Sequence, residues 1–188
     1  MDTKALATIA IFGAITIVLN LSPFKIPAPF APYLIYQIWE IPIVAAFLLY
    51  GLTVGFSISV INTLVLLAVF PGELPTGPIY NLAAVLSTLL GLIIIQKLSG
   101  HLSKRRDTIL TTAATASGII TRVVIMTIVN WVFLRFDPPI GFGIPAEALP
   151  AMLPVIGFFN ATIVLYTIPL GYIIARAVSL NTKTPVWG

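Results

Sequence analysis

Apolar residues fill six long stretches of this sequence, and polar or proline-rich segments separate them. The stretches cover approximately residues 4–21, 38–50, 54–70, 78–98, 108–136 and 149–178. A helix needs about 20 mainly apolar residues to span a bilayer, so the second and third stretches are marginal, whereas the last two are long enough to tilt or bend. Runs such as VINTLVLLAVF do not alternate as β-barrel strands do. The pattern predicts an all-α integral membrane protein, with residues 1–188 forming six transmembrane helices in one compact bundle.

The segments outside the helices carry their own expectations. Residues 22–40 hold four prolines and are expected to form a loop, and the polar tail 181–188 is expected to fray. Pro154 and Pro169 lie inside the last apolar stretch. Because proline removes a backbone hydrogen bond from a helix, this helix is expected to bend.

Composition strengthens the membrane assignment. Hydrophobic residues make up 59% of the chain and charged residues 9%, whereas a soluble protein is about 25% charged. There is no cysteine, which excludes disulfides, thiolate catalysis and Cys-ligated metals, and the single histidine, His101, falls in a basic loop. The net charge of +4 reflects membrane topology and requires no nucleic-acid partner.

The distribution of basic residues predicts the orientation. Six spans place both termini on one side, together with seven basic residues: Lys4, Lys97, Lys104, Arg105, Arg106, Arg176 and Lys183. The other side receives Lys25 and Arg135. Because positive charge favours the cytoplasm, both termini are predicted to be cytoplasmic, in a multi-pass protein of the plasma membrane.

Five asparagines fall in or beside five of the predicted helices, and none lies clearly in the cytoplasmic half: Asn20, Asn62, Asn81, Asn130 and Asn160. Each one taken alone could be a hydrogen-bonding contact between helices. As a set they favour a polar cavity that opens outward and suits a neutral, flat, amide-rich ligand, since asparagine offers donors and an acceptor without charge. Glu40, at the membrane edge of the first loop, is the candidate carboxylate.

Aromatic residues accompany these positions. Tyr36 and Trp39 precede the second helix, and Trp131 follows Asn130. They form either an interfacial aromatic belt or a stacking surface for an aromatic ligand.

Two further features concern individual helices. Arg122 lies about 12 Å along the helix axis from Asn130, on the cytoplasmic side. It is expected to lie too deep for a ligand contact and to have a structural or docking role. On the first helix, Ala10 and Ala14 are four residues apart, with Ala7 beside them. Small residues at this spacing allow close helix packing, and spacing alone favours packing within the chain over docking to another protein.

Three motifs resemble the substrate-binding S components of energy-coupling factor (ECF) vitamin transporters, most closely the riboflavin-specific members. They are YQIWEIPIVAAFLLYG at 36–51, MTIVNW at 126–131 and PVIGFFN at 154–160. The resemblance covers essentially the whole chain. It departs from riboflavin binders at Ile163, where lysine is usual, and at Ile61, where a lysine usually precedes the asparagine.

This resemblance implies a site and partners. Asn130 and Asn160 would contact the flavin, and the predicted ligand set adds Glu40, Tyr36, Trp39, Asn81, Asn62 and Trp131. Ala10 and Ala14, with Ala7, would form the docking face for a transmembrane T component. The chain would bind riboflavin from outside and deliver it with the T component and two ATPase subunits.

The sequence contains no G-x-x-x-x-G-K-[ST] motif, so any ATP use would come from these partners. Riboflavin would be cargo, and no cofactor, metal or catalytic residue is predicted. Three alternatives remain: a different vitamin in the same family, an intramembrane lipid-modifying enzyme, and an assembly subunit without a ligand. The enzyme has little support because the six acidic residues are scattered among loops and helix ends.

Overall fold

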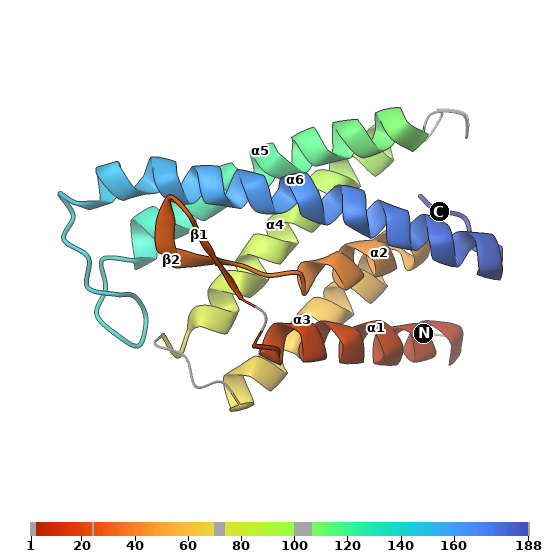
Figure 1. The fold of residues 1–188 in the computed structure, drawn as a ribbon, viewed down its shortest axis with the longest axis horizontal. Coiled ribbons are helices and arrows are strands. Elements are labelled where there is room, and N and C mark those ends of the chain that lie inside the picture. The colour runs from red at the N-terminus through yellow and green to blue at the C-terminus, as the bar shows by residue number, and fades with distance from the viewer. Residues whose placement is uncertain (1–2, 24, 70–73, 100–106, 188) are drawn as a thin grey trace.

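The computed structural model describes residues 3–23, 25–69, 74–99 and 107–187. Within these ranges the chain forms six α-helices and one β-hairpin (Figure 1). In chain order they are α1 (Thr3–Leu21), β1 (Ile26–Ala28), β2 (Ala31–Tyr36), α2 (Glu40–Tyr50), α3 (Leu52–Val69), α4 (Gly77–Leu98), α5 (Asp107–Phe133) and α6 (Leu149–Thr182). The prediction of a helical protein with six helices is confirmed for the described part of the chain.

Local sequence explains several helix boundaries. Gly51 separates α2 from α3 with φ of 81°, a backbone conformation that favours glycine, and its N–H donates to the Phe47 carbonyl. α5 ends at Phe133 rather than 136, shortly before two consecutive prolines. α6 runs unbroken past Pro154 and Pro169 and continues to Thr182, beyond the predicted end at 178.

Four of the described helices, α3 to α6, are long and apolar enough to cross a membrane. The chain therefore has the character of a membrane protein. The apolar part of α1, 5–21, and the whole of α2 are shorter than a full span. Six spans therefore stay a prediction.

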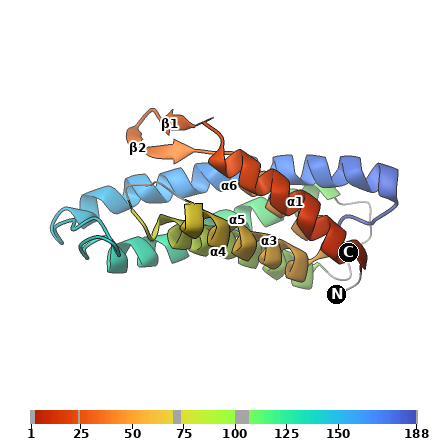
Figure 2. The same ribbon diagram turned by 90° about the horizontal axis from the view of Figure 1, so that it is seen from below.

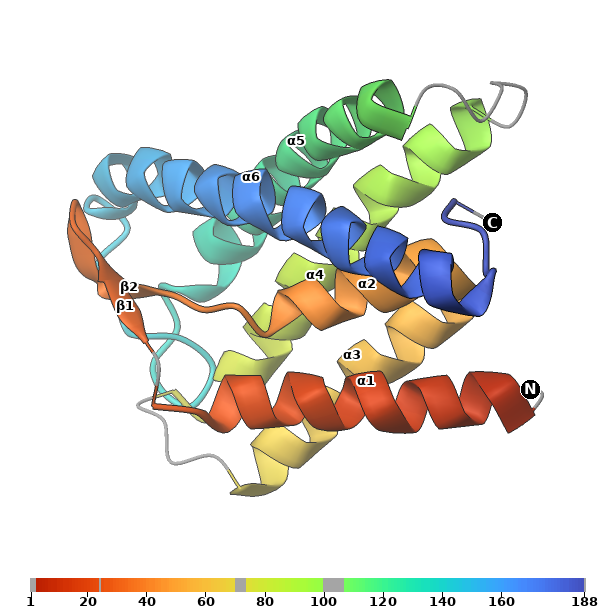
Figure 3. The same cartoon turned by 45° about the vertical axis from the view of Figure 1, so that its right-hand side comes forward.

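α2 occupies the middle of the bundle. Its residues from Glu40 to Leu49 are all buried, and it packs against α6, α3 and α1 (Figure 3). Because protein surrounds this helix, its 11 residues do not have to match the full thickness of the hydrocarbon. Its first residue, Glu40, is thereby placed inside the protein.

α4 and α5 pack closely through two glycines. A Cβ atom on Gly91 would lie 2.5 Å from the Cα atom of Gly118, so neither position has room for a larger side chain. Thr88 lies one turn before Gly91, and Arg122 lies one turn after Gly118. The close crossing brings these two side chains within hydrogen-bond distance, with 3.2 Å between Arg122 Nη1 and Thr88 Oγ1.

The proline-rich segment 22–40 contains an antiparallel β-hairpin, so the expectation of a simple loop is wrong. Ile26 pairs with Tyr36 and Pro27 with Ile35. A two-stranded sheet consists of edge strands, where proline is tolerated because its missing N–H need not pair. The hairpin lies along the outside of α6 (Figure 2), held by a 2.7 Å bond between the Tyr36 and Thr162 hydroxyls. This contact fixes the hairpin over one end of the bundle.

The start of α1 and the end of α6 lie at the same end of the molecule, opposite the hairpin (Figure 1). Their cytoplasmic orientation stays a prediction, and His101 and residues 104–106 lie outside the described residues.

The tail after α6 does not fray as expected. The backbone N–H of Trp187 donates to the Leu48 carbonyl at 2.9 Å, and Val186 and Trp187 pack against the core. The tail therefore satisfies one of the carbonyl groups left unpaired at the end of α2.

The small residues of α1 face outward. Ala7, Ala10 and Ala14 are all exposed, whereas Thr8 and Ile9 on the same helix are buried. The prediction that this spacing serves packing within the chain is therefore wrong for these three alanines. They belong to a surface that is free to meet lipid or another membrane protein.

Candidate functional site

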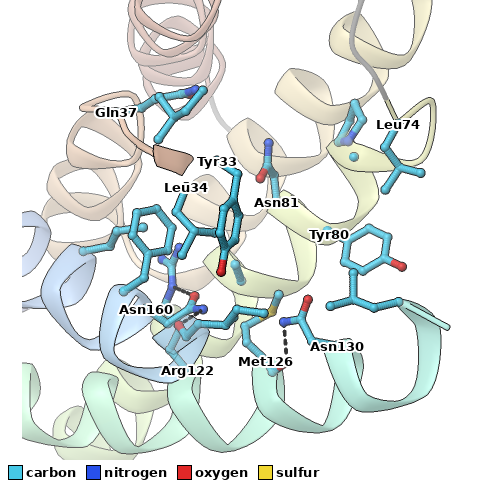
Figure 4. Close-up of a pocket in the computed structure, with 18 of the residues that line it drawn as sticks. Tyr33, Leu34, Gln37, Leu74, Tyr80, Asn81, Arg122, Met126, Asn130 and Asn160 are labelled. Atoms are coloured by element: carbon cyan, nitrogen blue, oxygen red, sulfur yellow. Dashed lines mark hydrogen bonds between the residues drawn. The ribbon is translucent and has the colours of Figure 1, made fainter. Parts of the chain in front are cut away.

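A cavity of about 630 Å³ lies under the hairpin, between the start of α2 and helices α4, α5 and α6. This volume falls within the range of about 300–1,000 Å³ that is typical of small-molecule sites. Polar and charged side chains on its wall are Asn20, Lys25, Gln37, Glu40, Asn81, Arg122, Asn130 and Asn160. Aromatic side chains on its wall are Tyr33, Trp39, Tyr80, Phe142 and Phe159. Figure 4 shows hairpin residues, including Tyr33 and Leu34, facing the labelled residues of α5.

The structure brings five of the eight predicted ligand residues to this cavity: Trp39, Glu40, Asn81, Asn130 and Asn160. They come from the start of α2 and from three other helices, far apart in the sequence. Their contact with a ligand stays a prediction. The fold therefore brings these five residues, predicted from separate parts of the sequence, together on the wall of one cavity.

Three predicted ligand residues lie outside the cavity wall. The Tyr36 hydroxyl bonds to Thr162, and its ring packs on Phe159 with 5.0 Å between the ring centroids. Asn62 accepts a 3.3 Å hydrogen bond from Asn20, which does line the cavity. Trp131 is 44% exposed. Because it follows Asn130 on a helix, its side chain points about 100° away, toward the outer surface of the bundle.

Asn130 presents an acceptor to the cavity. Its Nδ2 atom donates to the Met126 carbonyl at 2.6 Å, as the dashed line in Figure 4 shows. A carbonyl cannot donate, so the side-chain atom facing it must be the nitrogen. The amide oxygen of Asn130 therefore remains for a ligand.

Asn160 is held more fully by the protein. Its Nδ2 atom donates to the Ile156 carbonyl at 2.9 Å, and its Oδ1 atom accepts from Arg122 Nε at 2.9 Å (Figure 4). The second bond joins α6 to α5 on the cavity wall. Asn160 can offer a ligand the remaining lone pair of its oxygen and the second N–H of its amide.

Arg122 lies on the cavity wall, so the expectation that it is too deep to reach a ligand is wrong. Its two terminal nitrogens bind the two Glu40 oxygens, Nη1 to Oε2 at 2.5 Å and Nη2 to Oε1 at 2.9 Å. Nη1 also donates to the Thr88 hydroxyl. The side chains are only 4% and 6% exposed for Arg122 and Glu40. Glu40 is thus a buried partner of Arg122.

The spacing along α5 contained a signal for this arrangement. Arg122, Met126 and Asn130 are four residues apart, and all three are buried and line the cavity. Residues at this spacing lie on one face of a helix. The prediction considers only the distance between Arg122 and Asn130 along the helix axis and therefore gives them different roles. Because they share one face of α5, both side chains line the same cavity.

Comparison with known proteins supports the fold. No family model matches the sequence, and no curated protein matches it. A solved structure, described as the S component of a bacterial ECF transporter, superimposes with a TM-score of 0.76 and 24% sequence identity. The alignment covers 97% of this chain and 99% of that chain. The chain therefore has the fold of an ECF transporter S component.

Proposed function

We propose that this chain is the substrate-capture subunit of an ECF-type importer and that its cargo is riboflavin. The observation that carries the proposal is the cavity under the hairpin, in a fold shared over almost the whole chain with an S component. The motif likeness at 36–51, 126–131 and 154–160 favours riboflavin within that class. No covalent chemistry is assigned to the protein.

The chemistry of the cavity wall agrees with such a cargo. Aromatic side chains can stack on a flat ring system, and amide groups can bind its polar edges. Asn130 supplies an acceptor, and Asn160 lies across the cavity from it, on α6 (Figure 4). Riboflavin combines a flat ring, a polar ring edge and a hydroxylated chain, and it carries no net charge.

Delivery would require partners. We infer that the exposed face of α1 with Ala7, Ala10 and Ala14 meets a transmembrane T component, because small residues allow two helices to approach closely. Two ATPase subunits would supply the energy. The hairpin end would face outward and both termini the cytoplasm, as the basic residues predict.

Purification tests the cargo. If riboflavin is bound during expression, the protein should be yellow, show the visible flavin absorption band and release riboflavin that mass spectrometry identifies. Apoprotein should quench riboflavin fluorescence on titration. Colourless protein that causes no quenching would exclude riboflavin. Mass spectrometry would then identify any other vitamin carried by the same site.

A further inference from the structure

The innermost charged groups of the cavity form a neutral pair. Among the described residues of the wall, the charged side chains are Lys25, Glu40 and Arg122. Lys25 is exposed, whereas Glu40 and Arg122 are buried and joined by two hydrogen bonds. A ligand that reaches these two residues therefore meets charges that already compensate each other.

The pair still has hydrogen-bonding capacity. A guanidinium group carries five N–H donors. Four of them bind Glu40, Thr88 and Asn160. The fifth, on Nη2, has no acceptor among the residues that the structure describes. Each carboxylate oxygen of Glu40 keeps a free lone pair beside it. The pair thus offers a ligand one donor and adjacent acceptors.

An anionic group is poorly suited to this position. A carboxylate or phosphate at Arg122 would compete with Glu40 and would leave one negative charge without a counterion. A buried, unpaired charge is strongly unfavourable. An uncharged ring edge with a carbonyl next to an N–H has no such cost, since its carbonyl can accept from Arg122 and its N–H can donate to Glu40.

We propose that the Arg122–Glu40 pair determines the specificity of the site by selecting an uncharged ring edge with adjacent N–H and carbonyl groups and by excluding anionic groups from its depth. The assignment of such an edge to the flavin rests on the proposed function. The flavin ring has this edge, with N3–H between two carbonyl groups. Any anionic substituent of a ligand would lie near the exposed Lys25.

Two probes of nearly the same shape test the proposal on the purified full-length chain. 3-Methylriboflavin lacks the N3–H of riboflavin and keeps both carbonyls. It should bind wild-type protein about tenfold more weakly or worse, because the Glu40 acceptors lose their donor. Equal affinities for the two probes in wild-type protein would overturn the proposal without any variant.

Variants then test whether the Arg122–Glu40 pair causes the preference for riboflavin over 3-methylriboflavin. The double change Glu40→Leu with Arg122→Met replaces a buried ion pair by apolar residues, a change that proteins often tolerate. It should reduce the preference for riboflavin to about twofold or less. Glu40→Gln keeps the shape of the side chain and removes its charge. It should also reduce the preference for riboflavin over 3-methylriboflavin, because hydrogen bonds to a charged acceptor are stronger than those to a neutral one. An unchanged preference, with both affinities equally reduced, would mean that the pair is merely structural.

Tyr172→Phe is the matched control. It removes another polar contact between α5 and α6, the 3.0 Å bond from the Tyr172 hydroxyl to Asp107, which does not line the cavity. Its preference between the two probes should equal that of wild-type protein. If Tyr172→Phe also changes this preference, the reduced preference in the pair variants would be explained by a general loosening of the bundle, and the proposed role of the pair would be wrong.

The outcomes separate the two proposals. If wild-type protein binds riboflavin and 3-methylriboflavin equally well, the proposed riboflavin function is supported and the proposed role of the Arg122–Glu40 pair is wrong. If it binds no flavin, the proposed riboflavin function is wrong. Mass spectrometry of the copurified ligand then tests the role of the Arg122–Glu40 pair. An uncharged ring with adjacent N–H and carbonyl groups would support the role of the pair. A ligand without such an edge would overturn it.

Discussion

At the scale of single residues, the cavity depends on side chains that are paired within the protein and still have groups to offer. Arg122 and Glu40 neutralise each other, and Asn130 directs its nitrogen to Met126 and leaves its oxygen toward the cavity. Such pairing keeps polar side chains in fixed positions inside an apolar bundle. A rigid polar wall is what selective recognition of a small ligand requires.

Asn130 supplies the first test at this scale. Asn130→Ala removes the acceptor that faces the cavity and leaves a polar group of the bound ligand unpaired. We expect riboflavin binding to weaken by about 1–3 kcal/mol, measured by fluorescence titration. Trp131→Leu is the adjacent control. Because Trp131 is outside the cavity wall, this change should leave the affinity within about twofold of wild type. Unchanged affinity in Asn130→Ala would remove Asn130 from the site.

At the scale of elements, two segments without long apolar runs prove to be ordered. The hairpin of β1 and β2 covers the cavity, and the tail after α6 contacts the end of α2. Both are fixed by contacts with residues far away in the sequence, Thr162 for the hairpin and Leu48 for the tail. Their order therefore arises from packing and not from local propensity.

The tail gives a prediction at this scale. The Trp187 side chain packs against the core cluster around α2, and its backbone N–H donates to the Leu48 carbonyl. Trp187→Ala should reduce the free energy of unfolding by about 1–3 kcal/mol through the lost apolar contacts, which a lower thermal midpoint in detergent would report. Leu180→Ala, at a side chain that is 78% exposed, should change the midpoint little. Equal midpoints for Trp187→Ala and wild-type protein would show that the Trp187 side chain does not stabilise the bundle.

At the scale of the whole molecule, the two surfaces to which the proposed function assigns roles are separate. The cavity lies under the hairpin, and the alanine face of α1 lies on the outside of the bundle, apart from the cavity wall. Under the proposed function, mutations should therefore affect ligand capture and assembly with partners separately. This separation is a property of the fold, because α1 contributes to the described cavity wall through Asn20 at its last turn and through none of its three exposed alanines.

Assembly provides the corresponding test. Ala10→Trp combined with Ala14→Trp would place two large rings on the face inferred to meet the T component. We expect loss of copurification with the T component and loss of uptake, while riboflavin affinity stays within about twofold of wild type. Ile120→Trp is the control, since Ile120 is also exposed to the surroundings of the bundle, on α5. Normal assembly of the double variant would assign the T-component contact to another surface.

Much of this organisation could be predicted from particular residues. The long apolar runs located the helices, and the asparagines located the polar end of the bundle. The partner of Arg122 could not be predicted, because Glu40 is 82 residues away and the depth of α2 was unknown. Sequence neighbours suggest that Tyr36 and Trp131 belong to the site, but the hairpin packs Tyr36 against Thr162, and helix rotation directs Trp131 to the outer surface.

The sequence by itself determined the helical membrane character of the protein, because hydrophobic runs of sufficient length leave the backbone few alternatives in lipid. It also determined that polar amides gather toward one end. The tertiary structure alone decided which of them share a cavity, that α2 is buried, and that Arg122 is neutralised by Glu40. These outcomes depend on contacts between distant segments, which hydrophobic periodicity does not encode. The arginine that the sequence left without a partner is thereby placed at the centre of the proposed site.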